Sequence, residues 1–239
     1  KNPHLQTIYP LLDTRLMTIN FRQQSFLLPD GDFLELAFAG DPKKPCVLLL
    51  PGTEGSIRSA YIKCMTDVLT HNDWQVCVMQ YRSCGQQMNH HLKTYNGYDT
   101  QDLAAVIDYL VHIRGIQLEF ACGFSIGGNL LLHYLYNESQ HTLKAVACLS
   151  TPFDLLETVQ VLPIWYQRYL LRLVLKKAKT KLKQGMVLPV DLKALESIKR
   201  VFDFDEQVTA PVYGLSGAVE YYEKASCLKL LPELRTPVL

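Results

Sequence analysis

The sequence predicts an α/β fold with a mostly parallel β-sheet, flanking helices and a helical cap. Apolar runs of strand length alternate with segments of helical periodicity from Cys46 to Ser150, which is typical of parallel strands covered by helices on both faces. After Ser150 the segments are helical up to the apolar end at Pro237, which indicates a cap. The 239 residues are enough for one such domain with a cap.

The sheet begins with two strands that the turn residues at 29–32, Pro-Asp-Gly-Asp, join as an antiparallel pair. We expect these strands at Leu16–Leu28 and Phe33–Phe38, so the sheet is mixed. Continuous apolar runs predict the later strands, and apolar residues at helical spacing predict the helices. The strands are expected at Cys46–Leu50, Val76–Tyr81, Phe120–Gly123 and Leu143–Leu149, and the helices from Tyr61 to Asn72, from a cap at Asp99 or Thr100 to Val111, and at Ile126–Tyr136.

These patterns divide the chain into a core at residues 1–154, a helical cap inserted at 155–232, and the start of the next core strand at 233–239. Within the cap, residues 165–183 form an amphipathic helix with a basic side. This helix predicts either a solvated face of the cap or peripheral contact with an anionic lipid surface. Its basic residues are Arg168, Arg172, Lys176, Lys177, Lys179, Lys181 and Lys183.

The composition indicates a globular protein and argues against several other classes. Hydrophobic residues make up 48% and charged residues 20% of the chain, which is ordinary for a packed domain. The net charge of +1 does not favour a nucleic-acid partner. No apolar run reaches the roughly 18 residues of a membrane-spanning helix. No signal peptide is visible at the start of the sequence.

The cysteines bear on the cellular compartment. There are seven, an odd number, with no C-x-x-C pair, and most lie inside apolar runs. This usage favours reduced core thiols in a cytoplasmic protein over a disulfide framework. No Cys/His cluster has zinc-ligand spacing, and the adjacent His90 and His91 fit a surface loop, so no metal site is expected.

A G-x-S-x-G motif is the most informative segment of the chain. It occupies residues 123–129, Gly-Phe-Ser-Ile-Gly-Gly-Asn, between an expected strand and an expected helix. A nucleophile elbow needs this order of strand, sharp turn and helix, and the flanking glycines remove Cβ atoms that would collide there. The pattern therefore predicts Ser125 as a nucleophile at the end of a strand, with a plain glycine-rich turn as the alternative.

A serine nucleophile needs a base, a group that orients the base, and donors for an oxyanion. The N–H of Ile126 follows the serine at the start of a helix, where free N–H groups favour negative charge. A second donor normally comes from the loop after the third strand. Here that loop is residues 51–56, Pro-Gly-Thr-Glu-Gly-Ser, and the N–H of Thr53 is the candidate, unless the loop is an ordinary βα turn.

The base of a triad is not evident after Ser125. The histidines that follow are His133, eight residues along the expected helix, and His141 in the next turn, and we expect both to be structural. Asp154 follows a strand, where we expect it to cap a helix. The acids considered as triad partners are Asp154, Asp191, Asp203 and Asp205.

At this point the chain resembles the YheT-like esterases, also called the AB hydrolase 4 family. The resemblance rests on six short segments spread from end to end of the sequence. They are Asn-Pro-His-Leu-Gln-Thr-Ile at 2–8, the loop at 51–56, Tyr-Arg-Ser-Cys-Gly at 81–85, the motif at 123–129, Thr-Pro-Phe-Asp-Leu at 151–155, and Tyr-Tyr-Glu-Lys-Ala-Ser at 221–226. Two positions depart from the family pattern: Pro51 replaces a histidine, and Arg82-Ser83 replaces an Arg-Gly pair.

The resemblance implies an α/β-hydrolase fold and a carboxylic ester hydrolase that acts through a Ser-Asp-His triad, with no cofactor. It implies small-molecule esters of medium or long acyl chains as substrates. In the family the triad Asp follows a strand similar to residues 236–239, and the His comes later. We therefore expect both beyond Leu239, and we expect the 239 residues alone to be inactive.

The favoured function is a serine carboxylesterase that forms an acyl-enzyme at Ser125, with the N–H groups of Ile126 and Thr53 as the oxyanion hole. Two alternatives remain open from the residues. One is a hydrolase-fold protein without catalysis that acts as a lipid-binding or interaction module, because fold does not fix function. The other is acyltransferase or thioesterase chemistry at the same serine.

Overall fold

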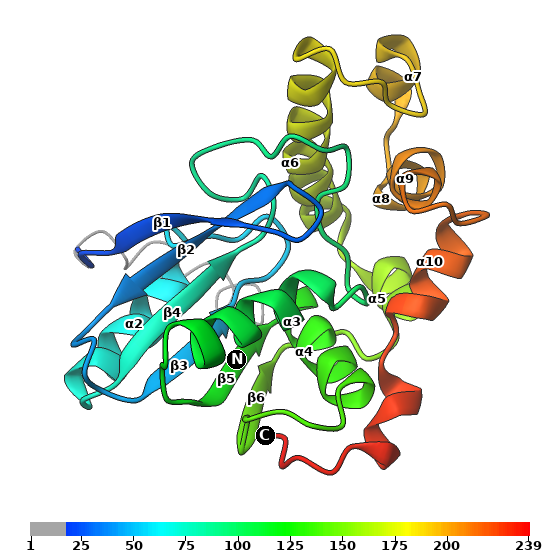
Figure 1. Ribbon diagram of the computed structural model, residues 1–239. Helices are drawn as coiled ribbons and strands as arrows, with labels where there is room; N and C mark the ends of the chain where they lie inside the picture. The colour runs from blue at the N-terminus through cyan, green and yellow to red at the C-terminus, as the bar shows by residue number, and fades with distance from the viewer. Residues whose placement is uncertain (1–17) are drawn as a thin grey trace.

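A six-stranded mixed sheet forms the core of the protein in a computed structural model that describes residues 18–239 (Figure 1). The strand order is β1-β2-β4-β3-β5-β6. β1 pairs antiparallel with β2, and β2 with β4, whereas the remaining neighbours are parallel. The prediction of a mostly parallel mixed sheet is therefore confirmed. The strands are β1 Arg22–Leu27, β2 Phe33–Ala39, β3 Cys46–Leu50, β4 Gln75–Gln80, β5 Leu118–Phe124 and β6 Ala145–Leu149.

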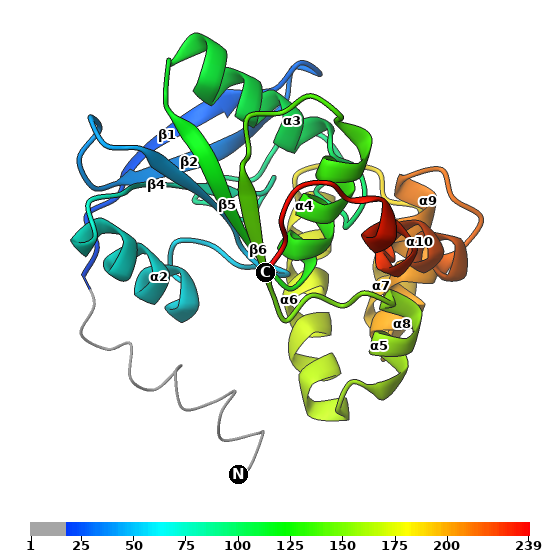
Figure 2. The same cartoon turned by 90° about the horizontal axis from the view of Figure 1, so that it is seen from below.

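Helices cover both faces of the sheet. α2 (Ala60–His71) lies on one face, and α3 (Gln101–Asp108) and α4 (Ile126–Asn137) lie on the other (Figures 1 and 2). The central strand β3 is buried along its whole length. Because side chains alternate along a strand, Val47 and Leu49 pack in the cluster under α2, while Leu48 and Leu50 pack in the larger cluster under α3 and α4.

Most predicted elements agree with the structure to within two residues at each end, and the start of the first strand differs most. The first strand was expected from Leu16, but among the described residues it begins at Arg22; residues 16 and 17 lie outside the description. The last strand was expected from Leu143, but it begins at Ala145. Leu143 is nevertheless buried in the main core, so its apolar character reflects packing in the preceding turn. The predicted helix at 100–111 is α3 continued by a π-helical turn at Tyr109–Ile113.

A group of helices follows β6 and stands to one side of the sheet (Figure 1). Two buried apolar clusters hold it together: one joins α5 and α10 to Ile126 of the core, and the other joins α6 to α7 and α8. The helices are α5 Leu155–Val161, α6 Ile164–Lys183, α7 Leu192–Ser197, α8 Val201–Phe204 with a π-helical continuation at Asp205–Thr209, α9 Ala210–Val212, α10 Ala218–Ala225, and a 3₁₀ helix at Leu228–Glu233.

The chain then returns to the sheet beside β6. Val238 forms a parallel bridge with Val146, and the N–H of Val146 donates to the carbonyl of Pro237. The N–H of Cys148 donates in the same way to the carbonyl of Leu239. The helical segment thus runs between two stretches that lie side by side at one edge of the sheet. Within residues 18–239 no helix is long and apolar enough to cross a lipid bilayer.

Candidate active site

Ser125 occupies the turn between β5 and α4. β5 ends at Phe124 and α4 begins at Ile126, so the serine is the single residue that joins strand to helix. Its backbone has φ 53° and ψ −121°, a region that L-residues seldom adopt and that costs about 1–3 kcal/mol. The N–H of Ser125 donates to the carbonyl of Leu149 at 2.8 Å, which fastens the turn to the end of β6. This is the strained geometry of a nucleophile elbow.

Two glycines make the sharp turn possible. A Cβ on Gly123 would lie 2.5 Å from the carbonyl oxygen of Gly127, across the turn. A Cβ on Gly127 would lie 2.5 Å from the carbonyl oxygen of Leu50 and 2.6 Å from that of Pro51. Those partners are backbone atoms, which cannot move aside, so only glycine fits at either position. Through Gly127, the elbow packs directly on the end of β3.

The loop at 51–56 lies against the elbow. β3 and β5 are adjacent parallel strands, and Leu50 pairs with Gly123 at their carboxyl ends. A Cβ on Gly52 would lie 3.3 Å from the Cβ of Ser125. The backbone of the loop after the third strand therefore reaches the serine, as the sequence predicts.

Two tyrosine hydroxyls fix the first half of this loop. The N–H of Gly52 donates to the hydroxyl of Tyr61 at 3.0 Å. The hydroxyl of Tyr81 donates to the carbonyl of Pro51 at 2.8 Å. Burial raises the pKa of both Tyr61 and Tyr81, so both hydroxyls stay protonated at neutral pH. Pro51, where the family has a histidine, is thus held through its carbonyl.

The second half of the loop leaves one N–H group without a partner. The N–H of Glu54 donates to the hydroxyl of Tyr95 at 2.7 Å, and that of Gly55 donates to Gly52 at 2.9 Å. Among the hydrogen bonds of residues 18–239, neither the N–H of Thr53 nor that of Ile126 has an acceptor. Both N–H groups are therefore free to donate to a bound group, and an oxyanion hole requires free donors near the nucleophile.

A buried ion pair joins this loop to α6. Nζ of Lys177 lies 2.6 Å from Oε1 of Glu54, and the two side chains are only 10% and 12% exposed. The hydroxyl of Tyr95 donates to the same carboxylate oxygen at 3.0 Å, and Lys177 also donates to Sγ of Cys84 at 3.2 Å. Burial opposes the charge on Lys177, but Cys84 and Glu54 raise its pKa above the usual value. Sequence reasoning missed this pair, whose members are 123 residues apart.

The basic side of α6 differs from the expectation. Seven cations were assigned to it, but Lys177 and Lys181 point into the protein instead. Lys181 is 2% exposed and donates to Oδ1 of Asn89 at 2.8 Å and to the carbonyl of His91. Burial lowers the pKa of Lys181 to about 8. Five cations therefore remain on the outer basic side of α6. Lys177 and Lys181 are four residues apart, so they lie on the same inner face of the helix.

The histidines that follow Ser125 bond to other groups. Nε2 of His133 lies 3.3 Å from the carbonyl of Ala225, and burial lowers the pKa of its ring. Nε2 of His141 lies 3.1 Å from the hydroxyl of Thr236.

The four acids considered as triad partners also have local contacts. Asp154 accepts from the N–H of Glu157 and caps α5, as expected, and Asp191 caps α7. Asp203 pairs with Arg200, and Asp205 accepts from Tyr222 and Thr209. Among residues 18–239, no group of three or more His, Cys, Asp and Glu is arranged to hold a metal ion.

The second departure from the family pattern lies in a structural cluster. Arg82 donates two hydrogen bonds to Asp102, at 2.6 and 2.7 Å, and pairs with Asp30 at 2.6 Å and Asp32 at 3.2 Å. Ser83 has φ 63°, a conformation that glycine adopts most easily, and its hydroxyl donates to Asn89. Ser83 therefore adopts the left-handed backbone conformation that suits the glycine found at this position in the family.

Comparison with known proteins defines the class. A family model described as the alpha/beta hydrolase fold matches residues 45–239, and the chain belongs to that family. The esterase Pf2001 of Pyrococcus furiosus superposes with a TM-score of 0.58 over 93% of this chain and 69% of its own, at 12% identity, which shows a shared fold.

Within that class the chain is similar to the putative esterase YheT of Escherichia coli, with 32% identity over all of this chain and 73% of the relative. The resemblance to YheT-like esterases is confirmed. The chain is also 29% identical to the monoacylglycerol lipase of Saccharomyces cerevisiae, over 91% of this chain and 50% of the lipase. It is 28% identical to human phospholipase ABHD3, over 98% of this chain and 61% of that relative. The chain therefore spans only half to two thirds of these two lipid hydrolases.

Proposed function

We propose that the protein is a serine carboxylic ester hydrolase that acts on medium- or long-chain acyl esters. The observation that supports this most strongly is Ser125, strained at φ 53° beside the Gly52 loop, with the N–H groups of Thr53 and Ile126 free. The names of its relatives, an esterase, a monoacylglycerol lipase and a phospholipase, support ester and lipid substrates. Residues 155–232 would form the cap over this site.

The proposed reaction has two steps. Oγ of Ser125 attacks the ester carbonyl, its proton passes to a base, and the N–H groups of Ile126 and Thr53 stabilise the oxyanion. The alcohol leaves with that proton, and water then attacks the acyl-enzyme to release the acid. Neither step requires a metal or an organic cofactor. The base is a histidine other than His133 and His141, which bond elsewhere.

The rings beside the serine suit an acyl chain. Tyr61 and Phe124 lie with their centroids 4.7 Å apart, directly next to Gly52 and Ser125. Apolar and aromatic walls with a few polar groups at the reacting atom are typical of small-molecule sites.

A fluorophosphonate probe tests the proposal on the full-length protein. Ser125 should displace fluoride and form a covalent adduct, and Ser125→Ala should not be labelled. Ser150→Ala is the matched control, since Ser150 also has φ 53° but lies at the end of β6. Hydrolysis of p-nitrophenyl butyrate, octanoate and laurate then measures chain-length preference. A full-length protein without labelling would instead favour a hydrolase-fold binding module.

A further inference from the structure

The outer side of the cap contains a basic groove with an apolar floor. Its volume is about 780 Å³, and α6 forms most of its wall. Leu171, Leu175 and Ile198 supply apolar surface inside it. Six cations surround this surface: Arg168, Arg172, Lys176, Lys179, Lys183 and Lys199.

Five of these cations form one stripe along α6. Their spacing of 4, 4, 3 and 4 residues keeps them on one face of the helix over about 22 Å, at 1.5 Å per residue. Lys179 pairs with Glu196 at 2.9 Å, and within residues 18–239 that is the one ion pair formed by a cation of the groove. The chain as a whole has a net charge of only +1, so the positive charge is concentrated on this face.

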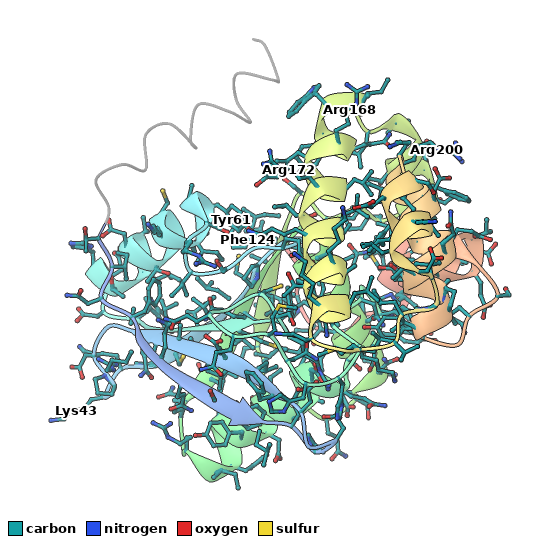
Figure 3. All side chains as sticks on the ribbon, turned by 90° about the horizontal axis from the view of Figure 1, so that it is seen from above. Lys43, Tyr61, Phe124, Arg168, Arg172 and Arg200 are labelled. Carbon is teal, nitrogen blue, oxygen red and sulfur yellow. The ribbon has the colours of Figure 1, made fainter. Side chains whose placement is uncertain are left out.

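Large apolar side chains stand exposed at the end of α5 and at the beginning of α6. Val161 and Ile164 are 72% and 68% exposed, and Trp165 and Tyr169 are 45% and 56% exposed. At 100° per residue, Ile164, Trp165 and Tyr169 fall with the five cations inside about 140° of the helix circumference. Figure 3 shows Arg168 near the end of α6 and Arg172 further along it.

We propose that this face of α6 docks on an anionic lipid bilayer, with the apolar tip in the interface and the cations on the headgroups. Cations supply the attraction to an anionic leaflet, and exposed aliphatic and aromatic side chains supply the insertion. A nucleic acid would use the cations but would leave Val161 and Ile164 in water. A merely solvated face would not explain why exposed apolar side chains share one side of α6 with the cations.

The opposite side of α6 reaches the candidate active site. Lys177 of this helix contacts Glu54 of the loop beside Ser125. Docking would therefore hold the cap helix against the bilayer while its inner side stays on the catalytic loop. The docking itself does not rest on the proposed esterase activity, since it is measured without turnover.

Vesicle sedimentation tests the docking. The protein should bind vesicles of equimolar phosphatidylcholine and phosphatidylserine and should bind pure phosphatidylcholine weakly. Because each basic side chain near an anionic leaflet contributes about a factor of five to partitioning, the triple variant Arg168→Gln, Arg172→Gln and Lys176→Gln should bind about 100-fold less. The matched control is Lys43→Gln, Lys144→Gln and Lys229→Gln, which removes three exposed cations elsewhere on the molecule. Lys43 lies far from α6 (Figure 3).

The apolar tip is tested separately. Val161→Gln with Ile164→Gln should weaken binding about tenfold, whereas Ile113→Gln, equally exposed at the end of the helix that begins with α3, should not. Ser125→Ala should bind vesicles like the parent. Equal binding of parent and triple variant, equal binding to the two vesicle types, or tighter binding to a DNA duplex than to the anionic vesicles would each overturn the proposal.

Discussion

Nζ of Lys177 lies 2.6 Å from Oε1 of Glu54, so that the middle of α6 is bonded to the loop beside Ser125. Both side chains are about nine-tenths buried. In such a place neither charge can be solvated once the other is removed. The pair is therefore a positioning device: it fixes Glu54, and with it the neighbouring N–H of Thr53.

We expect Lys177→Met to lower the free energy of unfolding by about 3 kcal/mol, because it leaves a buried carboxylate without its partner. We expect kcat of the full-length protein to fall about tenfold with a smaller change in KM, because the variant would displace the N–H of Thr53, the proposed oxyanion donor, rather than the substrate pocket. Urea unfolding and steady-state kinetics measure the two effects. Lys176→Met, the exposed neighbour, is the control and should change neither.

The double variant Glu54→Gln with Lys177→Met isolates the pair. Because neither charge then remains, its loss of stability should be smaller than the sum of the two single losses. Strict additivity of the three free energies would show that Glu54 and Lys177 act independently, against the positioning role.

The acid limit of stability should depend on Asp32. Burial would raise the pKa of this fully buried carboxyl, but hydrogen bonds from Asn89 and from the N–H groups of His90, Phe33 and His91 lower it to about 2. A lowered folded-state pKa contributes stability above the unfolded value near 3.8 and loses it as the pH falls to 2. The loss from Asp32 alone is about 2 kcal/mol.

Asp32→Asn shows this contribution directly, since its side chain does not titrate. The difference in unfolding free energy between parent and variant should be largest at pH 7 and should shrink by about 2 kcal/mol towards pH 2. Asp41→Asn, in an exposed turn, is the control. A difference that stays constant with pH would contradict the lowered pKa of Asp32.

Local patterns were sufficient to predict the sheet and the elbow. A continuous apolar run predicts β3 without knowledge of its neighbouring strands. The alternation of side chains along a strand then places Val47 and Leu49 on the same face. The G-x-S-x-G pattern predicts the turn at Ser125 because its glycines are needed for contacts within a few residues or with the adjacent strand.

Long-range polar contacts could not be predicted in the same way. Glu54 and Lys177 are separated by 123 residues, and no periodicity relates them. Lys181 was expected on the outer side of α6 because a helical pattern shows that the helix has two sides but not how the helix is rotated about its axis in the fold. The hydroxyls of Tyr61, Tyr81 and Tyr95 support one loop from three segments, and each tyrosine alone resembles an ordinary core residue.

Ionisation of thiols that are buried in the folded protein should lower its free energy of unfolding at alkaline pH. Burial raises the pKa of six cysteines in the folded state: to about 12 for Cys46, Cys84, Cys122 and Cys148, to about 11 for Cys227, and well above its usual value for Cys77. A raised folded-state pKa leaves stability complete below the unfolded value near 9 and removes it above.

Between pH 9 and 10 the free energy of unfolding should therefore fall by an amount on the order of 5 kcal/mol, measured by urea unfolding with a reductant present. The double variant Cys122→Ala with Cys148→Ala should lose about a third less over the same interval, since two of the six thiols are gone. An unfolding free energy that stays level through pH 10 would contradict this origin.

Backbone strain at Ser125 should be measurable as a difference in unfolding free energy between two variants of this residue. Ser125→Ala keeps a Cβ at φ 53° and so keeps the strain, whereas Ser125→Gly removes it. After allowance for the greater freedom of glycine in the unfolded chain, we expect the Gly variant to be about 1 kcal/mol more stable than the Ala variant. That difference corresponds to about 2–4 °C in Tm, and neither variant should react with a fluorophosphonate.

At Lys176, an exposed position in the middle of α6, the order should reverse, because glycine is less stable than alanine in a helix interior by about 1 kcal/mol. Lys176→Gly and Lys176→Ala are therefore the matched pair for the comparison at Ser125. If the Gly variant at Ser125 is also the less stable one, then the turn holds no strain that glycine can relieve. The geometry of Ser125 would then contribute to reactivity only through its placement beside Gly52.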